Sequence, residues 1–394
     1  MTWRALAAAI AIPAFGSEAL LRAAHKDDLA GVTKLLREGA DVRYSNDLGA
    51  TALWAACENG SLAMTELFLR SGASPDAALL KGETPLMTAA RGGYAPVVAA
   101  LLRHKAKVNA RGPRDQTALM WAVARKHATV VKQLIDAGAD IHARTAEWTD
   151  TMAVPPHGYR PYNKAIPHGR DTALLFAARE GDLESLQLLV AAGANVNDAD
   201  AWGVSALALA AHSGFTGMVE YLLGKGANPN ACGAGFCALH IAIMRRDVVM
   251  ARALLAKGAD ANTPLQTWTP TRRSSKDFHF TPELVGAKPY WLAARNASPE
   301  IMKLLAQHKA DVLAVHHSVK VTDATGATNE DRTDAIVAAL GRGAAWVDFT
   351  RDETLALACV RAAMEAGVKP SARAIEAAKT LRYSKVVALL GGSE

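Results

Sequence analysis

The chain has 394 residues, of which 50% are hydrophobic and 21% are charged, and its formal net charge is +6. This length is too great for one compact globule unless the chain is a repeat array, and the hydrophobic content is sufficient for a long continuous core. Lys and Arg are spread along the chain, which favours solvated helix faces over a nucleic-acid-binding track, and no apolar run is long enough to span a membrane.

The first residues resemble a secretory signal peptide. A single positive charge precedes a short apolar run, residues 5–12, and small residues stand at −3 and −1 of a candidate cleavage site before Ser17. We therefore expect residues 1–16 to be removed and the protein to be exported, either to a periplasm or to the medium. The alternative is a helix that caps the array of a cytoplasmic protein.

The basic unit of the chain is a pair of short helices, and residues 171–195 show it most clearly. Thr172 can cap the first helix, because a threonine hydroxyl accepts a hydrogen bond from an unpaired backbone N–H. Apolar residues recur at helical spacing until Gly181, and a second apolar run ends before Gly193, which is typical of a left-handed C-cap. Such a small helix pair cannot bury its apolar faces alone, so it requires copies on either side.

Copies of this unit recur with a base period of 33 residues. The positions equivalent to Leu174 are Leu20, Leu53, Leu86, Leu119, Leu174, Leu207, Leu239, Tyr290, Ala335 and Ala374. A glycine stands 19 residues after this position in most copies, but Lys105 and Lys309 replace it in two. A left-handed backbone at a non-glycine residue costs roughly 1 kcal/mol, which neighbouring interfaces can offset.

The unit is similar to the ankyrin repeat, which has the pattern Thr-Pro-Leu-x-x-Ala-Ala, a paired Leu-Leu and an ending Gly-Ala-Asp/Asn. The matching starts are residues 51–57, 84–90, 117–123 and 172–178, and the endings include those at Gly39, Gly138, Gly193 and Gly226. The match is strong from Ser17 to about Asp311 and weak beyond. It implies an all-α repeat fold, an ankyrin-repeat solenoid of about ten stacked helix pairs with short β-hairpin loops.

One position departs from the family pattern. Family members usually carry His after Thr-Pro-Leu, bonded to the Thr hydroxyl and to the next loop, and His240 alone keeps it here. The residues at the other positions are Trp54, Met87, Met120, Leu175, Ala208, Trp291 and Ile336. We therefore expect apolar packing to replace most of the polar contacts between repeats.

The long gaps in the repeat spacing divide the chain. The expected parts are repeats one to four (17–143), an inserted loop (144–170), repeats five to seven (171–262), a second inserted loop (263–288), repeat eight (289–315) and divergent C-terminal repeats with a cap (316–394). The first insertion is rich in proline and aromatic residues, so we expect an ordered loop. Residues 316–331 read as a polar, turn-rich connection, and helices are expected at 351–365, 371–379 and 383–390.

The two insertions are where we expect function. Both follow the Gly-Ala-Asp/Asn ending, where the family has a hairpin, so they should project from one edge, three repeats and roughly 30 Å apart. Aromatic residues and arginine dominate interface hot spots. The candidate contact residues are Trp148, Tyr159, Tyr162, Trp268, Arg272, Arg273, Phe278 and Phe280. The alternative is that these side chains fold the loops back onto the array.

No catalytic signature is found: the sequence contains no glycine-rich phosphate loop, nucleophile elbow or Cys/His pair. We therefore expect no enzyme activity and no cofactor. His157, His168 and His279 match no metal-ligand spacing, so no metal site is expected. Cys232 and Cys237 lie five positions apart, and whether they pair in an exported protein is left open.

The resemblance implies a non-enzymatic, monomeric scaffold that recognises an unidentified protein partner through the concave face and the two inserted loops. No nucleic-acid partner and no membrane insertion are expected. A second hypothesis is a small-ligand or enzyme-associated module with a pocket under the inserted loops, which requires both loops to converge. A third is a spacer without an exposed aromatic patch. The recurrent Arg91, Arg179 and Arg295 are expected to bond neighbouring carbonyl groups.

Overall fold

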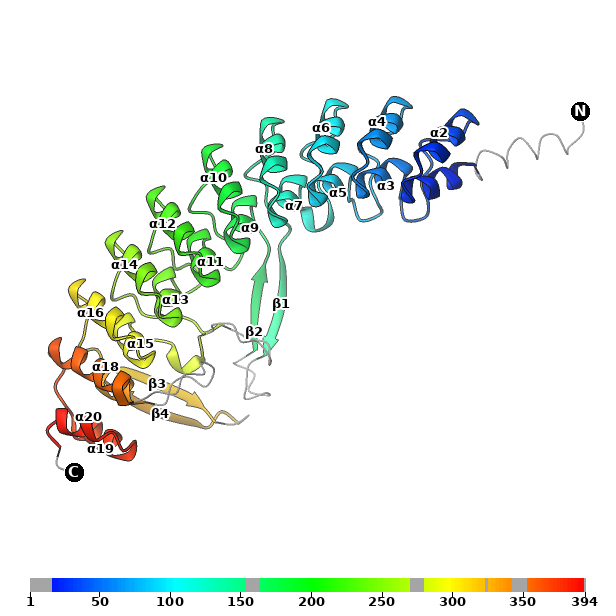
Figure 1. Ribbon diagram of the computed structural model, residues 1–394. Coiled ribbons are helices and arrows are strands. Elements are labelled where there is room, and N and C mark those ends of the chain that lie inside the picture. The colour runs from blue at the N-terminus through cyan, green and yellow to red at the C-terminus, as the bar shows by residue number, and fades with distance from the viewer. Residues whose placement is uncertain (1–15, 154–162, 270–279, 323–324, 342–352, 393–394) are drawn as a thin grey trace, which may run out of the picture. The chain divides into compact units, whose positions relative to one another are not determined.

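The computed structural model describes residues 16–153, 163–269, 280–322, 325–341 and 353–392. Their helices follow one another in pairs (Figure 1). The chain divides into two compact units, which are described separately: unit 1 comprises the described residues up to Glu147 together with Gly169–Asp198, and unit 2 comprises Trp148–His168 together with the described residues from Ala199 onward.

Unit 1 begins with a helix over residues 16–25. The helices that follow are α2 (Leu29–Arg37), α3 (Ala52–Glu58), α4 (Leu62–Arg70), α5 (Pro85–Gly92), α6 (Ala95–Arg103), α7 (Ala118–Ala124), α8 (Ala128–Asp136), α9 (Ala173–Glu180) and α10 (Leu183–Ala191). The first helices of the pairs, α3, α5, α7 and α9, contact one another in that order, and the second helices, α2 to α10, do the same. This two-layer stacking confirms the predicted all-α repeat fold.

Unit 2 is also built from helix pairs. Its helices are α11 (Ala206–Ser213), α12 (Thr216–Gly224), α13 (Ala238–Arg245), α14 (Val248–Ala256), α15 (Pro289–Arg295), α16 (Pro299–Gln307), α17 (Ala335–Leu340), α18 (Glu353–Glu365), α19 (Ala372–Thr380) and α20 (Ser384–Leu389). First helices again contact first helices, and second helices contact second helices. The last three helices lie where the sequence predicts them, within two residues at each end.

The predicted repeat register is confirmed by burial. All ten aligned positions, from Leu20 to Ala374, are at most 2% exposed. Threonine hydroxyls cap some of the first helices: Thr51 accepts a hydrogen bond from the N–H of Trp54 (3.1 Å), and Thr84 accepts one from that of Met87 (3.3 Å). The prediction is wrong for Thr172, which stands at the N-cap of α9 but whose buried hydroxyl makes no capping bond. Local capping and an apolar face therefore place the first helices that begin at these threonines.

The left-handed residues after the second helices also match the prediction. The glycines of most copies have positive φ, as at Gly138 (84°), and the two lysine replacements keep the same backbone, with φ of 62° at Lys105 and 60° at Lys309. These lysines bear the steric cost that glycine avoids.

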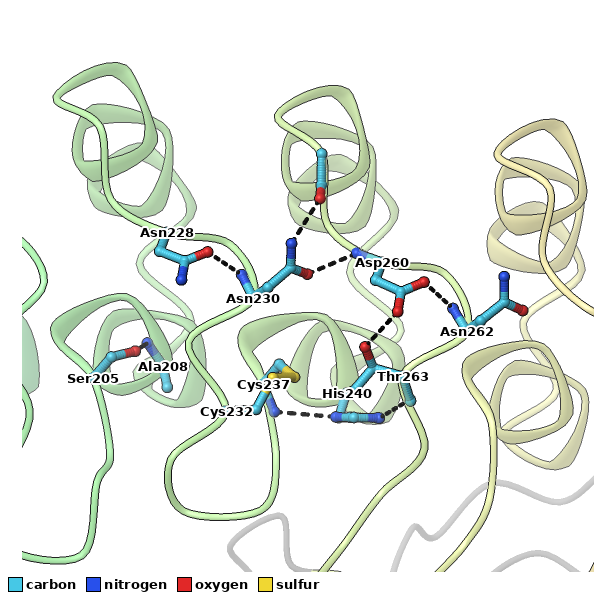
Figure 2. Close-up of a disulfide and its surroundings, with 11 residues drawn as sticks. Ser205, Ala208, Asn228, Asn230, Cys232, Cys237, His240, Asp260, Asn262 and Thr263 are labelled. Carbon is cyan, nitrogen blue, oxygen red and sulfur yellow. Dashed lines mark hydrogen bonds between the residues drawn. A yellow bond between two sulfur atoms is a disulfide. The ribbon is translucent and has the colours of Figure 1, made fainter.

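Asparagine side chains join successive loops, a role that sequence analysis did not assign. The amide of Asn230 donates to the carbonyl of Gly258 (2.9 Å) and accepts from the N–H of Asp260 (2.7 Å), as Figure 2 shows. Asn109 and Asn262 make the equivalent pair of bonds in their own repeats. Each net hydrogen bond is worth about 1 kcal/mol, so these amides stabilise the interfaces between repeats.

Unit 2 also contains two β-hairpins. The first insertion pairs β1 (Trp148–Ala153) with β2 (Asn163–His168), so its described part is ordered as expected. Residues 316–331 do not form the polar connection that we predicted: β3 (His316–Val321) pairs antiparallel with β4 (Thr328–Thr333). The β-branched residues of β3 favour a strand, and its two buried ends pack inward. Within the described ranges, no helix combines the length and apolarity that crossing a bilayer requires.

Candidate functional site

The structure locates three of the eight candidate contact residues. Tyr159, Tyr162, Arg272, Arg273 and Phe278 lie outside the described residues. Trp148, Trp268 and Phe280 are described, and each has a different environment.

Trp148 lies at the base of the first hairpin. Its half-buried ring stacks on His168, its partner in the strand register, with ring centroids 5.5 Å apart and planes at 18°. The Nε2 atom of His168 is 3.8 Å from a carboxylate oxygen of Asp150. Within the described residues, no group of three or more His, Cys, Asp or Glu side chains could hold a metal ion.

Phe280 packs the second insertion onto the array. It is 4% exposed, and its ring lies 5.5 Å from that of Phe236 and 6.3 Å from that of His240. The backbone N–H of Phe280 also donates to the hydroxyl of Thr269 (2.8 Å). Its ring therefore lies beneath the surface that a partner would touch.

Trp268 belongs to a cluster that joins the two insertions. Lys164 of β2 donates a hydrogen bond to the hydroxyl of Thr267, and its ammonium nitrogen lies 5.3 Å from the ring centroid of Trp268 and 5.6 Å from that of Trp202. We call Lys164, Trp202, Thr267 and Trp268 the loop cluster. Burial lowers the pKa of Lys164 below its ordinary value, so its ammonium group is partly desolvated.

The predicted separation of about 30 Å between the insertions is therefore wrong. Two paired strands of six residues extend a hairpin by roughly 20 Å, which brings β2 to the second insertion. Lys164 and Thr267 are 103 positions apart in sequence. Nothing in the local sequence distinguishes Lys164 or Trp202, so sequence reasoning missed both.

His240 anchors the start of the second insertion. Its buried ring accepts a hydrogen bond at Nδ1 from the N–H of Cys237 (3.0 Å) and donates from Nε2 to the carbonyl of Thr263 (2.9 Å), as Figure 2 shows. Cys237 forms a disulfide with Cys232, which closes the preceding loop. Burial lowers the pKa of His240 to about 4, because the charged ring would lose its hydration.

The titration of His240 should lower the free energy of unfolding by about 2 kcal/mol as the pH falls from about 7 to about 5. The pKa is about 4 in the folded chain against 6.5 for an ordinary histidine. The unfolded chain therefore binds a proton in this interval and the folded chain does not. Full stability is present above about pH 6.5 and is lost as the pH falls toward 4.

Urea unfolding at several pH values tests this, with a His240→Leu variant, which cannot titrate at this position, as the reference. The wild-type stability should fall more steeply than that of the variant by the predicted amount. Parallel curves for the two proteins would contradict the proposed protonation.

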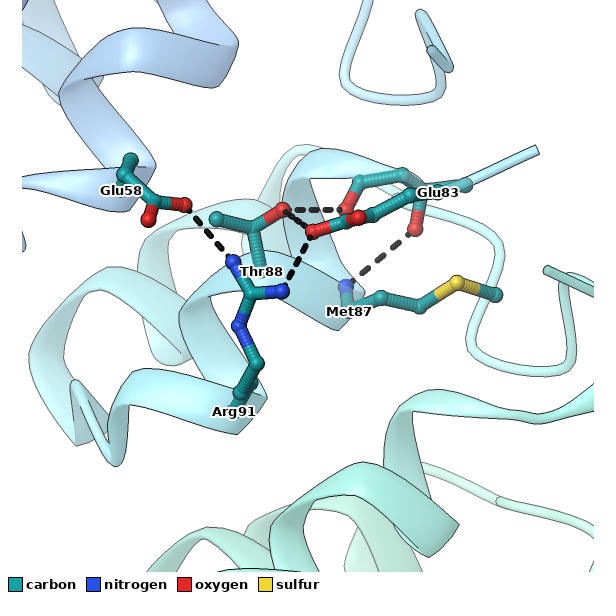
Figure 3. Close-up of polar contacts among 6 residues, drawn as sticks. Glu58, Glu83, Met87, Thr88 and Arg91 are labelled. Carbon is teal, nitrogen blue, oxygen red and sulfur yellow. Dashed lines mark hydrogen bonds and ion pairs between the residues drawn. The ribbon is translucent and has the colours of Figure 1, made fainter. Parts of the chain in front are cut away.

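A second polar cluster lies on the first helices of unit 1. Arg91 at the end of α5 forms an ion pair with Glu58 (2.9 Å) and another with Glu83 (3.3 Å), as Figure 3 shows. Its guanidinium group also lies 5.1 Å from the ring centroid of Trp121 on α7. Arg179 likewise pairs with Asp171 (2.8 Å). The expectation that these arginines bond carbonyl groups is wrong for Arg91, because carboxylates from the same and the preceding repeat lie within reach.

Two hollows adjoin this cluster and share Arg91 and Arg125. One, of about 280 Å³, is lined by Arg91, Gln116, Met120, Trp121, Ala124, Arg125 and Phe176. The other, of about 310 Å³, is lined by Glu58, Thr88, Arg91, Gly92, Tyr94 and Arg125. We call this surface the first-helix face.

Arg125 is the accessible charge of the first-helix face. It is exposed, and among the described residues its guanidinium group has no hydrogen-bond or ion-pair partner. Trp121 and Phe176, which line the hollow beside it, are both half-buried and present part of their rings. Unpaired arginine beside aromatic rings is typical of binding surfaces, since these residue types supply most interface hot spots.

Comparison with known proteins agrees with the repeat pattern. A family model for ankyrin repeats, in three copies, matches residues 20–111, 64–145 and 169–265, which together cover more than half of the chain. A protein of Treponema pallidum (strain Nichols), described as ankyrin repeat-containing, is 38% identical over 102 residues. That alignment covers 25% of this chain and 34% of the relative, so it spans about a third of the relative's length.

Proposed function

This chain belongs to the ankyrin repeat family, and we propose that it is a non-enzymatic scaffold that binds another protein. Repeats of this family are generally protein–protein interaction modules. Such arrays host many partners, so the partner must be inferred from the surface and not from the fold.

The first-helix face is the surface that carries this proposal. Arg125 and Arg91 line both hollows, Trp121 lines one of them and Tyr94 lines the other. Trp, Tyr and Arg are enriched where alanine substitution costs most binding energy. In this proposal the inserted loops add contacts, with Trp148 and Trp268 available and Phe280 serving to hold the second loop in place.

The test is the affinity of a purified partner. Proteins of the host that bind the immobilised chain are identified, and one is purified for isothermal titration calorimetry. The substitution Arg125→Glu should weaken binding at least about 10-fold, because it removes a hot-spot cation and adds a repulsive charge.

The matched control is Arg252→Glu. Arg252 is an exposed residue of α14, the second helix of its pair. Its replacement by glutamate changes the net charge by the same amount. It should leave the affinity unchanged. Equal affinities of the two variants would show that the first-helix face does not bind the partner.

A small-ligand or enzyme-associated role is the second candidate, and the convergence of the two insertions at Lys164 favours it. It requires a pocket beneath the loops. Loss of ligand binding in a Trp268→Ala variant that still binds the protein partner would distinguish this role from the first.

We also propose that the protein is exported and begins at Ser17. Two observations support this: the signal-like segment before Ser17, and a disulfide between Cys232 and Cys237, since disulfides persist in oxidising compartments. Residues 1–15 lie outside the described residues. N-terminal sequencing of the exported protein should give Ser17 as the first residue, whereas a cytosolic product that retains Met1 would contradict export.

A further inference from the structure

The loop cluster places a lysine ammonium group close to two indole rings. The Nζ atom of Lys164 is 5.6 Å from the ring centroid of Trp202 and 5.3 Å from that of Trp268, and it donates a hydrogen bond to Thr267. A cation within about 6 Å of an aromatic centroid is attracted by the ring quadrupole, most strongly for tryptophan. Two such rings and a hydroxyl group around one cation have the composition of an ammonium-binding site.

The cation and the rings come from different segments. Lys164 lies on β2 of the first insertion, whereas Trp202 lies in the loop before α11 and Trp268 lies in the second insertion. The lysine side chain has a flexible four-carbon stem. Lys164 can therefore leave the cluster without any change in the segments that carry the rings.

The segment that carries Trp202 is held by contacts that do not involve Lys164. Asp200 accepts a hydrogen bond from the N–H of Trp202 (2.9 Å), and the edge of Phe236 lies against the indole, with centroids 5.8 Å apart. The next residue, Gly203, has a φ of 89°, and a Cβ atom there would lie 2.7 Å from the backbone of Gly233. The loop is thus packed closely against its neighbour in the array.

The segment that carries Trp268 is held in the same way. Gln266 donates a backbone hydrogen bond to the carbonyl of Gly235 (2.8 Å), and Thr269 donates one to that of Phe280 (2.9 Å). Both bonds join backbone groups and need no side chain from β2. The backbone segments that carry the two rings are therefore fixed without Lys164, which favours a preorganised site.

We propose that Trp202, Trp268 and Thr267 form a binding site for an alkylammonium group, and that Lys164 is its occupant within the chain. A cation that is hydrated more weakly than a lysine ammonium group loses less hydration free energy when it enters this partly buried position. The site should therefore prefer methylated amines. The site takes its ligand class from these contacts alone, and it goes beyond the proposed protein-binding function without depending on it.

The test uses tetramethylammonium chloride on the full chain, with sodium chloride at equal ionic strength as the reference. The Lys164→Ala variant vacates the site and should bind tetramethylammonium at least about 10-fold more tightly than the wild type, because the internal competitor is gone. Shifts of the indole N–H signals of Trp202 and Trp268 in NMR spectra report the binding, and Lys164→Gln serves as a second vacating variant.

The controls remove a ring or a different lysine. The double variant Lys164→Ala/Trp268→Ala should lose the binding, and Lys320→Ala, which removes an exposed strand lysine of the other hairpin, should bind like the wild type. Equal affinity of Lys164→Ala and wild type would overturn the proposal. So would binding that survives the Trp268→Ala change.

An alkylammonium group can come from a free amine or from a side chain of another protein. Choline is therefore compared with a short peptide that carries trimethyllysine and with the same peptide carrying lysine. Tighter binding of choline assigns the site to a small molecule, and tighter binding of the methylated peptide assigns it to a protein. If no protein partner of the first-helix face exists, the tetramethylammonium result is unaffected, so the two proposals fail separately.

Discussion

Replacement of His240 by alanine should lower the free energy of unfolding by about 3 kcal/mol. The buried ring bridges the N–H of Cys237 and the carbonyl of Thr263, which begins the second insertion. Alanine leaves both groups without their partner and opens a cavity in a site that is 1% exposed. Equilibrium unfolding in urea, followed by circular dichroism, measures the change.

An exposed histidine provides the control for this substitution. His142→Ala, in a loop of unit 1, should change the stability by less than about 0.5 kcal/mol, as surface substitutions usually do. A loss below about 1 kcal/mol for His240→Ala would mean that the two hydrogen bonds do not join α13 to the second insertion in solution.

The substitution Met87→Ala should lower the free energy of unfolding by about 3 kcal/mol. Met87 connects its repeat to the following loop by apolar packing, as His240 does by hydrogen bonds. Met87 is fully buried, and a Cβ atom added to Gly112 would lie 2.6 Å from its sulfur. The methionine therefore reaches the loop before the next repeat, as His240 reaches Thr263. Alanine removes this contact and leaves a cavity between the two repeats.

Met87→Leu distinguishes this packing from a specific role of sulfur. Leucine nearly conserves the volume, so its cost should stay below about 1.5 kcal/mol. Urea midpoints of the two variants and the wild type give the comparison. Equal losses for alanine and leucine would contradict apolar packing as the substitute for the family's histidine.

Features set by nearby residues could be predicted from the sequence. The helix starts follow from a threonine and an apolar face, and the left-handed positions follow from glycine, so even the exceptional backbone at Lys105 and Lys309 was expected. The apolar replacement of the histidine was visible as well, because Met87 and Met120 stand in phase with His240. These signals repeat every 33 residues and reinforce one another.

Features set by contacts between distant segments could not be predicted. Lys164 is an ordinary polar residue until the hairpin brings it to Trp202 and Trp268. The carboxylate partners of Arg91 and Arg179 were likewise missed, because residues eight to 33 positions away supply them. The strand β3 was missed because His, Ser and Lys alternate with its apolar residues.

The site could be predicted only in part. Trp268 belongs to the loop cluster, and Phe280 is buried against Phe236 and His240. The assignment of partner contact to the remaining candidates stays a prediction: Trp148, Tyr159, Tyr162, Arg272, Arg273 and Phe278. Arg125 was not selected from the sequence. Arg125 has no carboxylate partner among the described residues, whereas Arg91 and Arg179 each have at least one. The sequence does not show this difference, because the fold decides which carboxylates come near each arginine.

Hydrogen–deuterium exchange of the full chain, alone and in complex with its purified protein partner, tests the central claim most directly. The account predicts that the partner slows exchange in α5, which carries Arg91, and in α7, which carries Trp121 and is followed by Arg125, and leaves α6 and α8 unchanged. Slowed exchange confined to α6 and α8, with α5 and α7 unaffected, would contradict binding through the first-helix face.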